Sequence, residues 1–117
     1  MNPEIFINSE DAAAWLKFDR ENPSFYPMFE RFAREAINHG HTRLSAWLIV
    51  NRIRWETSVV ARKDDGYKIS NGLIAFYSRM WSNDHPNHPN FLQQKTMKTA
   101  PFDDLFVARS AERRIQK

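Results

Sequence analysis

The chain contains no cysteine and only 3 glycines among its 117 residues. The absence of cysteine excludes disulfide bonds, thiolate metal ligands and cysteine nucleophiles. The glycines are too few and too scattered to build a loop that cradles a phosphate. No apolar run approaches the roughly 18–20 residues that span a bilayer, and the first residues lack the basic and apolar regions of a signal peptide. We therefore expect a soluble, cytoplasmic protein that makes no membrane contact.

Hydrophobic residues make up 42% of the chain and aromatic residues 14%, which is typical of a globular protein rather than a disordered one. A length of 117 residues matches one domain and is enough to bury a core without covalent cross-links. We expect a single domain over residues 1–117, with a core over about 9–82 and a C-terminal extension over about 83–117 that contains a last helix.

Capping residues and breaks in the hydrophobic pattern predict a mainly helical chain. Ser9 and Ser24 are good N-caps, and Asn22-Pro23 separates the two helices that they begin. The second helix carries an apolar stripe and is expected to end near Gly40, because glycine favours the left-handed conformation that often follows a helix. Further helices are expected from about residue 42 to 55, from 70 or 71 to 83, and after residue 101.

The predicted third helix is apolar on two sides. At 100° per residue, Ala46, Ile49, Val50 and Ile53 share one face, while Leu44, Leu48 and Trp55 fall on nearly the opposite face. Such a helix is either buried on both sides or keeps one side for a partner.

The hydrophobic period changes after this helix. Val59 and Ala61, and then Tyr67 and Ile69, alternate with polar residues around the turn signal Lys63-Asp64-Asp65-Gly66. This pattern predicts a β-hairpin with strands at about 57–62 and 66–70. The expected fold class is therefore mainly α with a small β-hairpin (α+β).

The order of two helices, a tight turn, a helix, a hairpin and a helix resembles a winged helix-turn-helix, in which the third helix enters the major groove. Gly40 fits the turn glycine, and Ala36, Ala46 and Ile49 fit the small or buried positions around it. Glu35 and His39 stand where apolar residues are usual and do not fit.

The basic charge lies in the middle of the chain. Residues 43–98 hold 9 Lys or Arg against 4 Asp or Glu, whereas residues 1–42 have a net charge of −3. One ridge of the third helix would carry Arg43, Trp47, Asn51 and Arg54. Arginine and asparagine are the side chains that read guanine and adenine edges in the major groove. The hairpin would add phosphate contacts from Arg62, Lys63 and Lys68.

These residues also have ordinary structural interpretations. Arg43 and Arg54 are able to pair with Glu30, Glu35 or Glu56, and a tryptophan at position 47 is more often part of a core than of a contact surface. Acidic residues at positions 64 and 65, at the tip of the hairpin, would repel phosphate.

Several stretches resemble a family of small phage and prophage proteins. They are Arg52-Ile53-Arg54-Trp55-Glu56, Tyr67-Lys68-Ile69-Ser70-Asn71, Tyr77-Ser78-Arg79-Met80 and His85-Pro86, which follow the phenylalanine-rich second helix. The resemblance covers about residues 20–95 and implies a phage or mobile-element origin, with no assigned activity and no catalytic residues to carry over.

Two functions follow as expectations. The first is a winged-helix-like nucleic-acid-binding protein that contacts duplex DNA, a transcriptional or replication regulator. The alternative is a phage-encoded inhibitor of a host protein, of the anti-defence or anti-CRISPR kind, that acts by protein–protein binding. The surplus of tryptophan and arginine and the two-sided third helix favour this alternative, because Trp and Arg often anchor interfaces.

Catalysis and metal binding have little support in the sequence. His85-x-x-His88 and His39-x-His41 are the only spacings to consider, and His85 and His88 each precede a proline, which excludes a helical pairing of two histidines. No serine stands in a nucleophile-elbow motif. We expect no enzyme activity, no metal and no cofactor. A homodimer through Phe102, Leu105 and Phe106 of the last helix is a further possibility.

Overall fold

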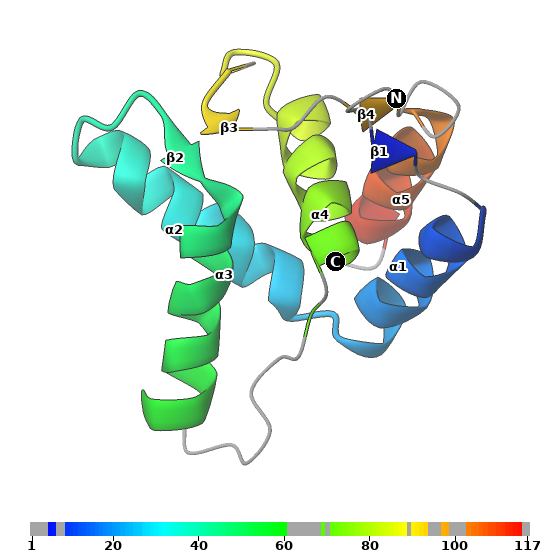
Figure 1. Cartoon of the computed structure of the whole chain (residues 1–117), viewed down its shortest axis with the longest axis horizontal. Coiled ribbons are helices and arrows are strands. Elements are labelled where there is room, and N and C mark those ends of the chain that lie inside the picture. The colour runs from blue at the N-terminus through cyan, green and yellow to red at the C-terminus, as the bar shows by residue number, and fades with distance from the viewer. Residues whose placement is uncertain are drawn as a thin grey trace.

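The computed structural model describes residues 5–6, 9–60, 69, 71–88, 90–93, 97–98 and 103–115. This part of the chain is mainly helical (Figure 1). Its elements are, in chain order, β1 (Ile5–Phe6), α1 (Ser9–Glu21), α2 (Phe25–Asn38), β2 (Leu44–Ser45), α3 (Ala46–Trp55), the π-helical turn η1 (Glu56–Val60), α4 (Asn71–Asp84), β3 (Leu92–Gln93), β4 (Met97–Lys98) and α5 (Asp103–Ile115). None of the described helices is long and apolar enough to cross a membrane.

The strands form two short parallel pairs. β1 pairs with β4, and β2 pairs with β3, so that Leu44 lies opposite Leu92 and Ser45 opposite Gln93. The Leu44 N–H also donates to the Phe91 carbonyl at 2.7 Å. The β2–β3 pair therefore ties the start of α3 to the segment that follows α4.

An aromatic cluster forms the centre of the core where α1, α2, α4 and α5 meet. Trp15 of α1 is fully buried, stacks on Phe76 with 5.6 Å between ring centroids, and meets Tyr77 and Phe106 edge-on. Phe25 of α2 packs on Tyr77 at 4.7 Å. Large aromatic side chains bury much apolar area each, so a chain of this length fills its core with few residues.

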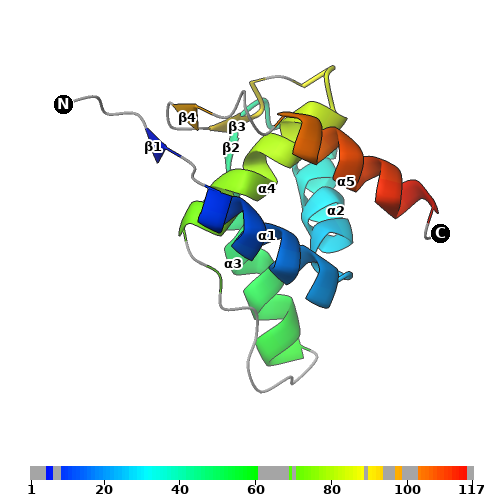
Figure 2. The same cartoon turned by 90° about the vertical axis from the view of Figure 1, so that its right-hand side faces the viewer.

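α3 lies at the side of this core and extends away from it. Its C-terminal part projects beyond the other helices in both views (Figures 1 and 2). Ala46, Ile49, Val50 and Ile53 are buried, as the 100° spacing predicts. One face of α3 therefore holds the helix to the rest of the protein.

The sequence pattern located most helices correctly. α1 begins at Ser9, α2 runs to Asn38 and α4 begins at Asn71, as the capping residues indicate. Gly40 adopts a positive φ of 90°, the Gly40 N–H donates to the Ile37 carbonyl and the His41 N–H donates to the Ala36 carbonyl. This is the Schellman arrangement that ends a helix at a glycine.

Two predictions around α3 are wrong. The helix begins at Ala46 rather than near Thr42, because Leu44 and Ser45 pair with β3 and the Ser45 hydroxyl accepts from the Trp47 N–H at 3.2 Å. Residues 57–60 form a helical turn and not a strand, since the Thr57 hydroxyl donates to the carbonyls of Ile53 and Arg54 and continues the helix. The rest of the expected hairpin lies outside the described residues, apart from residue 69, which belongs to no strand.

The C-terminal part of the chain contributes to the same core. Phe91, Leu92 and Phe106 are buried members of the main hydrophobic cluster. Because Phe106 packs inside the protein, it cannot form the dimer contact that the sequence suggested.

α5 presents Arg109 and Ser110 to the interior, and both are buried. Asp19 of α1 is fully buried and accepts hydrogen bonds from the Tyr77 hydroxyl at 2.7 Å and from the guanidinium groups of Arg109 and Arg113, both at 2.5 Å. One carboxylate thus joins three helices, α1, α4 and α5.

Candidate binding surface on helix α3

The outward side of α3 and η1 is an apolar surface exposed to solvent. The exposed fractions are 47% for Trp47, 58% for Leu48, 59% for Trp55, 52% for Val59 and 62% for Val60. Among the described residues, Val107 on α5 is the remaining large hydrophobic residue that is exposed. Large apolar side chains gathered on one element mark an interaction site more often than the same residues scattered singly. We call these five residues the α3 surface.

The local sequence explains why this face points outward. Ala46, Ile49, Val50 and Ile53 lie on the opposite side of the helix and supply all of its buried residues. Trp47, Asn51 and Trp55 follow one another at spacings of four, and therefore lie along one line on the exposed side. Of the two apolar faces that the sequence predicts for this helix, one is thus buried in the core and the other faces solvent.

The structure brings together part of the predicted nucleic-acid ridge. Trp47, Asn51 and Arg54 lie on the outward side of α3 and are exposed. Arg43 is also exposed, but it precedes β2 and does not belong to α3. The prediction that Arg43 begins a regular helical ridge is therefore wrong. The predicted positions Arg62, Lys63 and Lys68 lie outside the described residues.

The charge pairing differs from the one considered from the sequence. Within the described part of the chain, Arg43 and Arg54 form no ion pair, and Glu30 faces His85 instead. It is Arg52 that binds the glutamates, with its Nε 2.9 Å from Glu56 and its Nη1 4.0 Å from Glu35. Arg52 is not among the predicted site residues, although its spacing of four from Glu56 is typical of a helical ion pair.

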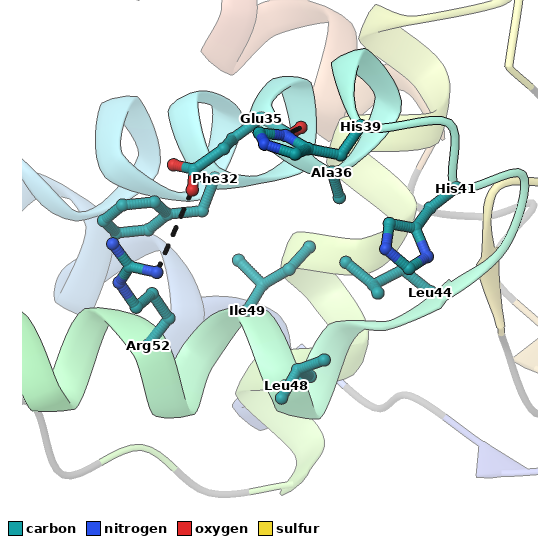
Figure 3. Close-up of a pocket in the computed structure, with 9 residues that line it drawn as sticks. All are labelled: Phe32, Glu35, Ala36, His39, His41, Leu44, Leu48, Ile49 and Arg52. Carbon is teal, nitrogen blue, oxygen red and sulfur yellow. Dashed lines mark hydrogen bonds and ion pairs between the residues drawn. The ribbon is translucent and has the colours of Figure 1, made fainter.

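Arg52 also helps to shape a groove between α2 and α3. Its guanidinium lies over the Phe32 ring, 4.8 Å from the centroid, and bridges the two helices (Figure 3). The groove has a volume of about 280 Å³ and is open to solvent. It is lined by Phe32, Glu35, Ala36, His39, His41, Leu44, Leu48, Ile49 and Arg52.

The close-up view shows how the groove is arranged. The side chains of Ala36 on α2 and of Ile49 on α3 point toward each other across it (Figure 3). His41 stands at one end, and the Arg52–Glu35 pair stands at the other (Figure 3). The His39 ring lies back along α2 beside Glu35, with its Nδ1 2.8 Å from the Glu35 carbonyl oxygen (Figure 3). The groove thus has an apolar middle and polar ends.

A second group of polar residues lies between α2, α4 and α5. Asp84 accepts hydrogen bonds from the Tyr26 and Ser110 hydroxyls, each at 2.6 Å. Burial raises the pKa of Tyr26 far above its usual value, and the nearby charge of Asp84 raises it further. Burial and the charge of Asp19 raise the pKa of Tyr77 in the same way. Both phenols therefore stay protonated and act as hydrogen-bond donors that hold the helices together.

The histidines do not gather into a metal site. His85 stacks on Trp81 with 4.3 Å between ring centroids, and its Nδ1 lies 2.8 Å from the Trp81 carbonyl, to which it donates. Its Nε2 is 3.5 Å from Glu30, whose carboxyl pKa is raised by burial although His85 opposes the shift. Across the described ranges, no three His, Asp or Glu side chains converge on a common point.

Comparison of the chain with protein-family models, with curated proteins and with solved structures finds no match. The α3 surface and the adjoining groove are therefore interpreted from their own geometry and chemistry.

Proposed function

We propose that this protein is a binding module that contacts another protein through the α3 surface. The observation that supports this is the gathering of Trp47, Leu48, Trp55, Val59 and Val60 on one projecting element, while other described parts of the surface show a single large exposed hydrophobic residue, Val107. Tryptophan and arginine anchor binding energy at protein interfaces more than other residues do, and Arg54 lies on the same side.

Stability does not require these residues to be apolar. The opposite face of α3 already holds the helix in place through four buried residues. An exposed tryptophan gains little from folding, because its ring stays in contact with water. A partner that covers the ring therefore gains the hydrophobic free energy of removing it from water. This is the reason for assigning the α3 surface to binding.

The proposal is tested by capture from a bacterial lysate, the first one to try given the resemblance to phage and prophage proteins. The full chain, a Trp47→Ala/Trp55→Ala double variant and a Val107→Ala control are immobilised and exposed to nuclease-treated lysate. Loss of one interface tryptophan typically costs about 2 kcal/mol or more, roughly 30-fold in affinity. A stoichiometric protein should be retained by the parent and the control and lost by the double variant.

Equal retention by all three proteins would contradict the proposal, as would the absence of any protein whose capture depends on the two tryptophans. The control is matched because Val107 is as exposed as Trp55 but lies on α5.

Duplex DNA is the second candidate partner, and a specific observation favours it. Arg43, Asn51 and Arg54 are exposed, and the two arginines are not neutralised by any described acidic residue. Binding to DNA would fall steeply as salt rises, because each neutralised phosphate releases counterions. Fluorescence anisotropy with a labelled duplex at about 50 mM salt tests this. A salt slope that decreases in an Arg43→Ala/Arg54→Ala variant would favour DNA over a protein partner.

A further inference from the structure

The α3 surface and the α2–α3 groove form one continuous apolar area. Leu48 belongs to both, since it lines the groove and is 58% exposed on the outward side of α3. Leu44 and Ile49 extend this apolar area into the groove, toward Ala36 and Phe32 of α2. A partner that covers the α3 surface therefore meets a depression at the edge of the same contact.

The size of the depression indicates what enters it. Its volume of about 280 Å³ stands at the lower end of the roughly 300–1,000 Å³ of pockets that enclose a small molecule or cofactor. It is also open along one side. A single large apolar side chain that projects from a partner suits such a depression, and fully desolvated anchors of this kind carry much of the energy of protein interfaces.

The charges around the area indicate the chemistry of the partner. Arg31, Arg43 and Arg54 lie on or beside α2 and α3, and Arg43 and Arg54 have no ion pair among the described residues. Both nearby glutamates, Glu35 and Glu56, are bound to Arg52. These two glutamates share one arginine, and Arg31, Arg43 and Arg54 add three further positive charges, so the net charge around the apolar area is positive. A positive area is complementary to an acidic partner and steers its association.

A symmetric contact between the α3 surfaces of two copies of this chain does not match these charges. Glu56 is the only acidic residue of α3 and η1, and it is bound to Arg52. A symmetric contact would place each copy's Arg54 against another cationic surface. A helix from a different, acidic protein avoids this repulsion.

We propose that the occupant is an acidic amphipathic helix of a partner protein, which lays its apolar face on the α3 surface and inserts one large apolar side chain into the α2–α3 groove. This inference rests on the proposed function, because it names the kind of partner for the same surface. A helix presents apolar anchors at positions i, i+4 and i+7 along one side. α3 offers Trp47 and Trp55 two turns apart on its outward side, with Leu48 between them on the side of the groove.

The probe is a displayed library of amphipathic helices of about 18 residues, with apolar residues at the anchor positions and Glu, Gln or Lys at random elsewhere. The library is selected on the full chain and counter-selected on the Trp47→Ala/Trp55→Ala variant. We expect enrichment of Glu over Lys and of a large apolar residue at one anchor. Enrichment of Lys, or no enrichment beyond the counter-selected protein, would overturn the inference.

The affinity of the enriched peptide is then measured on single variants. Ala36→Phe fills the groove from α2 and should weaken binding at least 10-fold, and Trp55→Ala should do the same. Ala36→Leu, which places a smaller side chain at the same groove position, repeats the groove test if Ala36→Phe unfolds the protein. Val107→Ala should leave the affinity unchanged.

The outcomes separate the two proposals. If Trp55→Ala weakens binding while Ala36→Phe and Ala36→Leu do not, the groove has no role and this inference is wrong, but the α3 surface still binds protein. If no helix is enriched and duplex DNA binds in a Trp55-dependent manner, the acidic helix is excluded and the surface belongs to nucleic acid. If neither binds, the inference is wrong, and the lysate experiment alone decides the proposed function.

Discussion

Replacing Asp19 by asparagine is expected to destabilise the protein more than any other single change of similar size. Asp19 is fully buried and faces the guanidinium groups of Arg109, which is 3% exposed, and of Arg113, which is 16% exposed. Asparagine keeps the volume of the side chain and removes its charge. Two cations then remain inside the protein without the carboxylate that compensates them.

The magnitude follows from the cost of an uncompensated buried charge. Removing one member of a buried ion pair typically costs about 3–5 kcal/mol, and the remaining contact of Arg109 with Glu112 at 2.8 Å keeps the loss within this range. In a domain of this size, each kcal/mol lost from the free energy of unfolding lowers the melting temperature by about 4 °C. The melting temperature of Asp19→Asn should therefore fall by roughly 12–20 °C.

Urea denaturation followed by circular dichroism measures the change in the free energy of unfolding. Glu21→Ala is the matched control, because Glu21 is an acidic residue on the surface of the same helix. Its side chain lies 3.9 Å from Lys17, and both members of this ion pair are exposed. Exposed pairs of this kind contribute about 0–1 kcal/mol. A loss of less than about 1 kcal/mol in Asp19→Asn would refute the reasoning, because it would mean that the charges are not desolvated.

Three further results are expected. Gly40→Ala should lower the free energy of unfolding by about 1–2 kcal/mol in urea denaturation, because its φ of 90° is unfavourable for a residue with a Cβ; an unchanged value would contradict the Schellman ending of α2. Burial raises the pKa of Glu30 in the folded protein above 4.5, so its stabilising contribution is complete below that pH and is lost as the pH rises through the folded value. Glu30→Gln should therefore gain stability relative to the parent between pH 4 and neutrality, as measured by unfolding at several pH values, and a relative loss would contradict this sign. Trp47→Ala and Trp55→Ala should each change the free energy of unfolding by about 0.5 kcal/mol or less, as is usual for surface positions; a larger loss in thermal unfolding would place the tryptophans in the core.

The helices could be predicted because their signals are local. The apolar stripe of α2 and the buried face of α3 repeat at helical spacing, and Gly40 marks the end of α2 through its own backbone preference. The exposed side of α3 was also visible as a second apolar face. The sequence alone left open whether that face was buried, because the answer depends on which helices pack around it.

The polar network could not be predicted because its partners are far apart in the chain. Asp19 lies 58 residues from Tyr77, 90 from Arg109 and 94 from Arg113. No local pattern signals such a pairing. The β2–β3 pair could not be predicted either, since strands of two residues are too short to show an alternating pattern.

The incorrect hairpin strand has a more specific cause. Val59 and Val60 are β-branched residues, which favour strands on average. In this chain they follow a helix whose last turn is continued by the Thr57 hydroxyl, which donates to the Ile53 carbonyl at 2.9 Å. A helix that is already formed extends at low cost, whereas a new strand needs a partner. Thr57 itself is buried, which fixes this turn against the core.

The positions of the core and of the α3 surface explain why folding and binding can be tested separately. Trp15, Tyr77 and Asp19 lie where α1, α4 and α5 meet, and variants there should change stability. Trp47 and Trp55 lie on the exposed side of a helix that is anchored through its other side, so variants there should change binding much more than stability. A variant of Trp55 that melts like the parent but no longer binds would therefore show a loss of contact, not a loss of fold.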